Sequence, residues 1–119
     1  MDKVFSTLMA VNASYLLFET SNPRHAHEWT VFRDRASEIP EDKILIPGVI
    51  DSTTNFVEHP KLVAERIEKF IQIVGSERIL AGSDCGFGTF AGFGVVDPDI
   101  AYAKLQALSQ GAKIVSKRI

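Results

Sequence analysis

The sequence predicts an α/β protein made of about three βα units, with parallel strands too few to form a closed sheet. Short apolar segments at residues 15–19, 44–50 and 78–82 are typical of buried strands, and each is followed by polar residues and then by a helical pattern. Strands that alternate with helices pair in parallel through right-handed crossovers. The remaining strands of such a sheet either come from elsewhere or are replaced by self-association.

The first predicted unit begins after a short helix. Residues 2–11 carry apolar side chains at helical spacing and predict that helix. Residues 15–18 are aromatic and apolar, and this predicted strand ends at Glu19, just before a cluster of turn-forming residues. Residues 25–35 then form a weakly helical stretch.

The second unit is the clearest one. Its strand, residues 44–50, contains Pro47, which lacks the N–H that a regular sheet uses and, together with Gly48, indicates a bulge or an irregular strand end. A helix starts near Pro60, because proline loses no hydrogen bond at the first helical position. An apolar stripe continues to Gly75, a natural helix stop.

The third unit contains a glycine-rich loop. Its strand, residues 78–82, leads to residues 86–94, which hold four glycines and three phenylalanines. No Gly-Lys-Ser/Thr follows, so a mobile lid with aromatic anchors is favoured over a phosphate-binding loop. The last helix is predicted to begin with Asp97 as N-cap and Pro98 behind it, and to run past Gly111.

Composition excludes several classes of protein. A chain of 119 residues with 45% hydrophobic residues and a net charge of -2 argues against disorder and against nucleic-acid binding. No apolar run is long enough to span a membrane. The one cysteine, Cys85, excludes an internal disulfide, and no signal peptide is evident, so the expected compartment is the cytoplasm.

Potentially reactive side chains follow all three predicted strands. Glu19 ends the first and Asp51 the second, whereas Asp84 and Cys85 follow the third. The carboxyl ends of parallel strands meet at one edge of a sheet, so these residues are expected at the same end. Glutamate and cysteine are both zinc ligands. The alternatives are that Glu19 caps a loop, that Cys85 is a small residue in a tight turn, and that both aspartates bind backbone amides.

The histidines allow two interpretations. His25 and His27 could be metal ligands, or they could form a solvated helix start with one ring packed on Trp29. His59, directly before Pro60, is most simply a helix-start residue.

Four motifs together resemble a known family. They are Leu17-Phe18-Glu19-Thr20-Ser21-Asn22-Pro23-Arg24-His25, then Pro47-Gly48-Val49-Ile50-Asp51, then Glu58-His59-Pro60 with Val63-Ala64-Glu65-Arg66-Ile67, then Gly82-Ser83-Asp84-Cys85-Gly86-Phe87. This combination is similar to the C-terminal catalytic barrel of the cobalamin-independent methionine synthases, and above all to its shorter single-barrel relatives. The resemblance implies that residues 1–119 are the C-terminal part of a (β/α)₈ TIM barrel, which needs about 250 residues when complete.

The same resemblance implies a zinc cofactor. The family binds catalytic zinc through a His-x-Cys pair, a glutamate and a second cysteine, and by position Glu19 corresponds to the glutamate and Cys85 to the second cysteine. No His-x-Cys occurs in this chain. The methionine synthases proper also carry a histidine soon after the aspartate that corresponds to Asp51. This chain has no histidine there, and Thr53 stands near that position. An alkyl donor or a thiol different from those of the methionine synthases is therefore an alternative, as in alkyl transferases acting on thiol coenzymes.

Three hypotheses for function follow. The first is a zinc-dependent methyl or alkyl transferase of methionine-biosynthesis type, acting on a small-molecule thiol and an alkyl donor, in which Asp51 and Asp84 bind substrate; no catalytic residue is assigned. The second is a truncated, non-catalytic remnant or self-associating module. The third is a barrel enzyme related to uroporphyrinogen decarboxylase. An open sheet of three strands has unpaired edges and an exposed apolar face. The isolated chain is therefore also predicted to self-associate or to need the missing half of the barrel.

Overall fold

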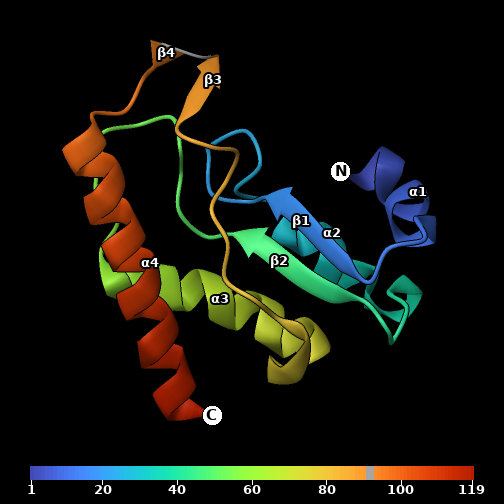
Figure 1. Ribbon diagram of the computed structural model, residues 1–119. Helices are drawn as coiled ribbons and strands as arrows, with labels where there is room; N and C mark the ends of the chain where they lie inside the picture. Colours follow the sequence, from blue (N-terminus) through green and yellow to red (C-terminus); the bar gives the residue numbers. More distant parts are fainter. Residues whose placement is uncertain (91–92) are drawn as a thin grey trace.

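The computed structural model describes residues 1–90 and 93–119. The chain forms, in order, η1 (Asp2–Val4), α1 (Phe5–Ala10), β1 (Tyr15–Glu19), α2 (Trp29–Asp34), η2 (Ala36–Glu38), β2 (Ile44–Gly48), α3 (Pro60–Val74), η3 (Ser76–Arg78), β3 (Gly88–Phe90), β4 (Phe93–Gly94) and α4 (Pro98–Arg118), where η denotes a 3₁₀ helix (Figure 1). This is a mixed α/β fold, as predicted. The weakly helical stretch at 25–35 is turns up to Glu28, and α2 occupies only its second half.

The sheet near the middle of the molecule has two assigned strands, β1 and β2, which run in parallel (Figure 1). The prediction of a third strand at residues 78–82 is wrong in this form: η3 includes Arg78, and the rest of the segment makes only isolated parallel bridges to β2. Leu80 N–H donates to the Leu45 carbonyl at 3.0 Å, and Gly82 N–H donates to the Pro47 carbonyl at 3.1 Å. The segment therefore lies beside β2 on the side away from β1.

Pro47 explains why this third line of hydrogen bonds is broken. The pairing of β1 with β2 continues through Phe18 opposite Pro47 without a shift, so the predicted bulge at Pro47 is absent there. On the other side of β2, a regular parallel ladder would require Pro47 to donate to Leu80, and proline has no N–H. Pairing survives only on either side of that gap, at Leu45–Ile79 and Gly48–Gly82.

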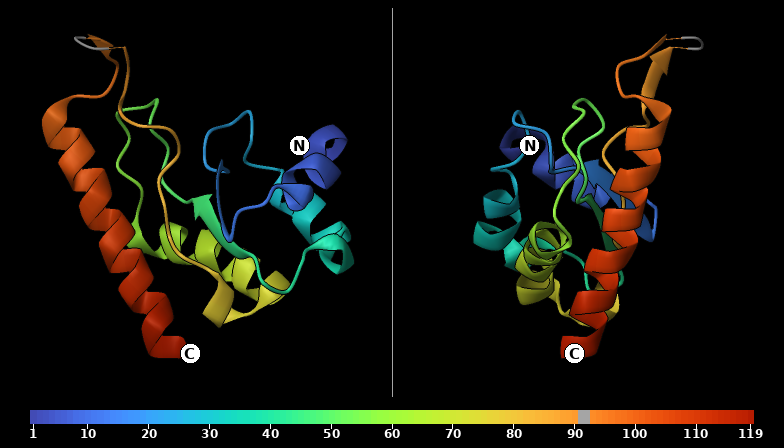
Figure 2. Two further views of the ribbon diagram at one scale, coloured as in Figure 1. Left: turned by 45° about the vertical axis from the view of Figure 1, so that its right-hand side comes forward. Right: turned by 90° about the vertical axis from the view of Figure 1, so that its left-hand side faces the viewer.

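The two long helices begin and end where local sequence signals place them. α3 has Pro60 at its first position and Gly75, with φ of 90°, at its C-cap, and the Asp97 carboxylate caps α4 by accepting from Asp99 N–H at 2.9 Å. α4 crosses α3 in both figures (Figures 1 and 2). A side chain on Gly111 would place its Cβ 2.4 Å from Val63 Cγ1, so glycine permits this close crossing.

Two hydrophobic clusters support this arrangement. The first joins α1, β1, α2, β2 and α3 through Phe5, Met9, Leu16, Phe32, Ile39, Leu45 and Phe70. The second joins the end of β2 to α3 and α4 through Val49, Ile50, Val63, Ala64, Ile67, Ala107 and Val115. Alternate residues of β1 differ sharply, because Leu16 is buried whereas Leu17 is 71% exposed. The sheet therefore buries one face and leaves apolar side chains of the other uncovered, and self-association stays a prediction.

The glycine-rich stretch contains two short strands that were not predicted. β3 and β4 pair antiparallel and project beyond the N-terminal end of α4 (Figures 1 and 2). Residues 91–92 of the predicted lid lie outside the described residues, and the mobile lid with aromatic anchors stays a prediction. Within the described ranges, no helix has the length and apolar character needed to cross a membrane.

Candidate functional site

Glu19 and Cys85 lie in contact at the end of the sheet. Glu19 is the last residue of β1, and Cys85 follows the segment that bridges to β2 from the other side. The Cys85 backbone N–H donates to Glu19 Oε1 at 3.2 Å across 66 residues of sequence. Both side chains remain accessible, with the Glu19 side chain 31% exposed and Cys85 classed as exposed. A hollow of about 360 Å³ opens here, lined by residues 17–19 and 83–86.

The two groups perturb each other's ionisation in the metal-free chain. The hydrogen bond from the Cys85 thiol lowers the pKa of Glu19, with further lowering by the Cys85 backbone N–H and by His25, against an opposing effect of burial. The same hydrogen bond raises the pKa of the Cys85 thiol, and burial and the negative charge of Glu19 raise it further. Without a bound cation, Cys85 is therefore held as a protonated thiol against a carboxylate.

Asp84 holds the loop after β1 in place. Its carboxylate accepts hydrogen bonds from the backbone N–H groups of Thr20, Ser21 and Asn22 at 3.1, 3.2 and 2.8 Å, and from the Asn22 side-chain amide at 2.9 Å. Burial raises the pKa of Asp84, and these hydrogen bonds offset only part of that shift. A Cβ on Gly48 would lie 2.1 Å from Asp84 Oδ1, so the glycine at the end of β2 makes room for this carboxylate.

His25 is the histidine that reaches the site. Its Nδ1 lies 2.9 Å from Glu28 Oε2, and its Nε2 lies 3.5 Å from Glu19 Oε2. A carboxylate beside one ring nitrogen orients the ring and directs the other nitrogen at its target. His27 is exposed, and His59 caps α3 by accepting from Lys61 N–H at 3.1 Å, as expected for a helix-start residue.

A second polar cluster, which sequence reasoning missed, lies where α3, α4 and the loop after β2 meet. Lys104 of α4 is fully buried, and its Nζ donates to the Phe56 carbonyl at 2.6 Å and to Glu58 Oε1 at 2.9 Å. Glu58 also accepts from the Asp51 backbone N–H at 2.7 Å. A lysine on the apolar face of a helix was the signal that could have revealed it.

Asp51 belongs to this second cluster and not to the Glu19–Cys85 contact. Its carboxylate accepts from the backbone N–H and the hydroxyl of Thr53 at 3.0 and 2.8 Å. Burial raises the pKa of Asp51, but the hydrogen bonds of Thr53 and Thr54 and the charge of Lys104 outweigh that effect, and the pKa is lowered overall. It lines a different hollow from Glu19, together with Glu58 and Arg66. Of the four predicted site residues, Glu19, Asp84 and Cys85 are brought together, whereas Asp51 stands apart.

The donor atoms at Glu19 and Cys85 suit zinc in kind, because zinc accepts carboxylate oxygen and thiolate sulfur. Their number falls short of a full set. Across residues 1–90 and 93–119, no group of three or more His, Cys, Asp or Glu side chains is arranged to hold a metal ion. The described residues therefore offer one carboxylate and one thiol of the kinds that zinc accepts, beside an open hollow.

Two curated relatives match part of the chain. It is 33% identical over 72 residues to a methionine synthase from Thermococcus kodakarensis, covering 60% of this chain and 20% of the relative. It is 34% identical over 77 residues to a 2-hydroxypropyl-CoM lyase from Xanthobacter autotrophicus, covering 65% of this chain and 19% of the relative. The chain thus spans about a fifth of the length of the curated relatives it matches. No family model matches it.

A solved structure matches nearly the whole chain. It is that of a B12-independent methionine synthase from Shewanella sp. W3-18-1 in complex with selenomethionine, with a TM-score of 0.74 and 24% identity. The match covers 98% of this chain and 30% of that one. The fold of residues 1–119 is therefore similar to about a third of a larger enzyme, and the resemblance predicted from the sequence motifs is confirmed.

Proposed function

We propose that this chain contributes Glu19 and Cys85 to the zinc site of an enzyme that transfers a methyl or another alkyl group to or from a small-molecule thiol. The observation that supports this proposal best is the contact between the two residues, at 3.2 Å from Cys85 N to Glu19 Oε1. Both lie at the end of the sheet where parallel α/β folds place their active sites. The similarity to a methionine synthase and to a 2-hydroxypropyl-CoM lyase supports the reaction class.

The residues of the chain have distinct tasks in this proposal. Zinc, when bound, would lower the pKa of a coordinated substrate thiol and so present it as the nucleophilic thiolate. Glu19 and Cys85 would be ligands, and Asp84 would hold the loop after β1 so that Glu19 faces Cys85. Glu28 would orient His25 toward Glu19, which makes His25 the nearest additional nitrogen. The hollow of about 360 Å³ would admit the substrate.

The finer fold assignment is part of the same proposal. Residues 1–119 would be the C-terminal part of a (β/α)₈ barrel, and the strands missing beside β1 would cover the exposed side chain of Leu17 and bring the remaining zinc ligands. The substrate thiol and the alkyl donor are left open by this proposal, because the names of the two relatives refer to different compounds.

Zinc binding by the purified chain tests the proposal. We expect chelator competition to show zinc bound by the wild-type chain, and Cys85→Ser or Glu19→Gln to weaken binding at least about tenfold, because each removes one ligand of few. Co²⁺ substitution gives a second measurement, since a thiolate ligand produces a sulfur-to-metal charge-transfer band that Cys85→Ser should abolish. Glu41→Gln, an exposed carboxylate elsewhere, is the matched control.

Two results would contradict the proposal. Zinc binding that is unchanged by Cys85→Ser would place the metal elsewhere. Zinc no higher than in a buffer blank would favour the alternative of a non-catalytic, self-associating module. The specific observation in favour of that alternative is the lack of a third arranged ligand among the described residues.

A further inference from the structure

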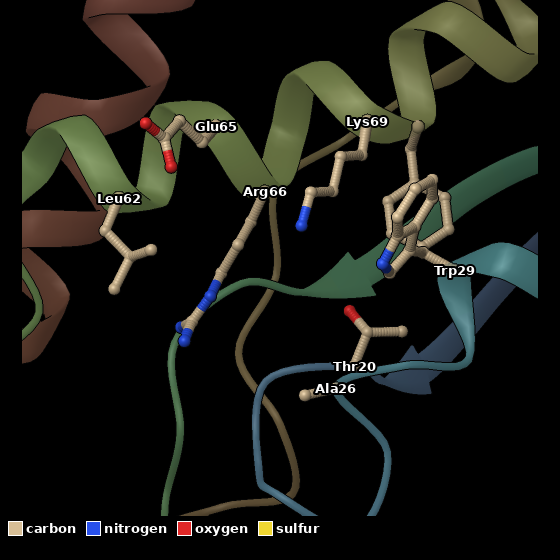
Figure 3. Close-up of a pocket in the computed structure, with 8 residues that line it drawn as sticks. Thr20, Ala26, Trp29, Leu62, Glu65, Arg66 and Lys69 are labelled. Atoms are coloured by element: carbon tan, nitrogen blue, oxygen red, sulfur yellow. The ribbon is translucent and has the colours of Figure 1, made fainter.

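Another cavity of the chain lies outside the Glu19–Cys85 hollow. It has a volume of about 190 Å³ and lies between α3 and the segment that joins β1 to α2 (Figure 3). Its lining residues are Thr20, Ala26, Trp29, Leu62, Glu65, Arg66, Lys69 and Phe70, and neither Glu19 nor Cys85 is among them. Because a water molecule in the liquid takes about 30 Å³, the volume suits roughly six waters or one small organic molecule.

The polar atoms that face this cavity are mostly hydrogen-bond donors. In Figure 3 the Lys69 ammonium and the indole nitrogen of Trp29 lie on one side of this space and the Arg66 guanidinium lies on the other, whereas the Glu65 carboxylate is directed away from it. Lysine, arginine and the tryptophan N–H can donate hydrogen bonds but cannot accept them. The Thr20 hydroxyl also faces this space, but it already donates to the Gly48 carbonyl at 2.7 Å.

The two cations of the cavity keep capacity for another anion. Lys69 belongs to none of the ion pairs found among the described residues, and its Nζ lies 4.8 Å from the centre of the Trp29 ring. Arg66 donates to the Val49 carbonyl at 3.1 Å, which uses one of its five N–H donors. Its distance to Glu58 is 3.7 Å, longer than a charge-assisted hydrogen bond of about 2.8 Å.

Part of the cavity wall is apolar or aromatic. Phe70 is buried, Leu62 is partly exposed, and the Trp29 ring adds an aromatic surface whose centre lies 4.8 Å from Lys69 Nζ and 5.0 Å from the Arg33 guanidinium. Positive groups beside a flat apolar wall match a molecule with one anionic group on a small planar body. We propose that this cavity binds a small organic anion, with a carboxylate or phosphate between Lys69 and Arg66 and an apolar ring against Trp29.

Binding can be measured on the whole chain, because Trp29 is its one tryptophan. We expect benzoate or phenyl phosphate to change the Trp29 emission in a saturable manner, and the stronger of the two identifies the preferred anionic group. Benzamide, which has the same ring without the charge, should cause little change. Binding by benzamide equal to that of benzoate, or no saturable response to either anion, would overturn the proposal.

Charge variants separate this site from general attraction. Lys69→Met should weaken binding at least about tenfold, because a hydrogen bond to a charged group is lost. Substitution of Lys69 itself alters the emission of the neighbouring Trp29. The affinity of each variant is therefore measured by calorimetric titration, which does not depend on emission. Lys113→Met, an equal loss of charge at an exposed position of α4, is the control and should bind as the wild type does. Equal weakening by both substitutions, or unchanged binding by Lys69→Met, would refute the site.

Cys85→Ser distinguishes this site from the proposed zinc site. Anion binding should persist in Cys85→Ser and in the presence of a chelator, because the cavity shares no lining residue with the Glu19–Cys85 hollow. Loss of anion binding in that variant would contradict the proposal of an independent site.

Discussion

Two buried carboxylates of this chain, Asp84 and Glu58, both accept backbone N–H groups, but Glu58 is also paired with a cationic side chain. Asp84 accepts backbone N–H groups of one loop and one side-chain donor, the Asn22 amide. Glu58 is paired with the side chain of Lys104, from a helix 46 residues further along the chain. Backbone donors need no counter-ion and fix local loop shape, whereas an ion pair fixes two distant elements and leaves a bare charge when one partner is removed.

The largest effect is expected at the ion pair. Lys104→Met should lower the free energy of unfolding by about 3–5 kcal/mol, because the buried Glu58 loses its closest cation in a setting with little water. Urea denaturation measures this change, and Lys113→Met provides the control at an exposed site, with an expected change within about 0.5 kcal/mol. Similar midpoints for both variants would show that Lys104 is not needed to stabilise the α4 contact.

A smaller and more local effect is expected at Asp84. Asp84→Ala removes the acceptor of several buried donors and should cost about 2–3 kcal/mol. Hydrogen exchange should accelerate at the amides of Thr20, Ser21 and Asn22 and change little in α3 and α4. Asp34→Ala, whose side chain is 64% exposed, is the control. Unchanged exchange in the loop would favour the prediction of substrate binding over loop positioning.

The smallest effect concerns the reactivity of Cys85. Its raised pKa means that less thiolate is present at neutral pH, so alkylation by iodoacetamide should be slow and should rise with pH to a midpoint above that of an ordinary cysteine thiol. Glu19→Gln removes both the hydrogen bond and the charge that raise the pKa, so it should speed alkylation at pH 8 by about threefold or more. Glu41→Gln should leave the rate unchanged, and an equal rate in the Glu19 variant would show that Glu19 does not control this thiol.

The parts of the fold that the sequence predicted are those specified by neighbouring residues. Pro60 and Gly75 mark the ends of α3, and Asp97 marks the start of α4. The third predicted strand does not form a regular ladder, because its pairing depends on Pro47 of β2, which has no N–H to donate. β3 and β4 were missed because a glycine-rich segment carries little strand preference of its own.

The candidate site also has one contact that the sequence could predict and one that it could not. The approach of Glu19 to Cys85 could be anticipated, because the order of the parallel strands places their ends at one edge. The pairing of Lys104 with Glu58 could not, because α4 was interpreted from its apolar residues alone. Lys104 follows Ile100 by four residues and precedes Ala107 by three, which places it on the buried face of α4 and requires a buried partner.

The 66-residue separation of Glu19 and Cys85 has a consequence for the order in which the chain assembles. Closing so long a loop costs conformational entropy, so we expect this contact to form after the local helices and after β2 has taken its place between the two segments. A partly folded or cleaved chain can therefore keep its helical circular dichroism and still lack the pair. The reactivity of one thiol thus reports completion of folding, which helical content alone does not.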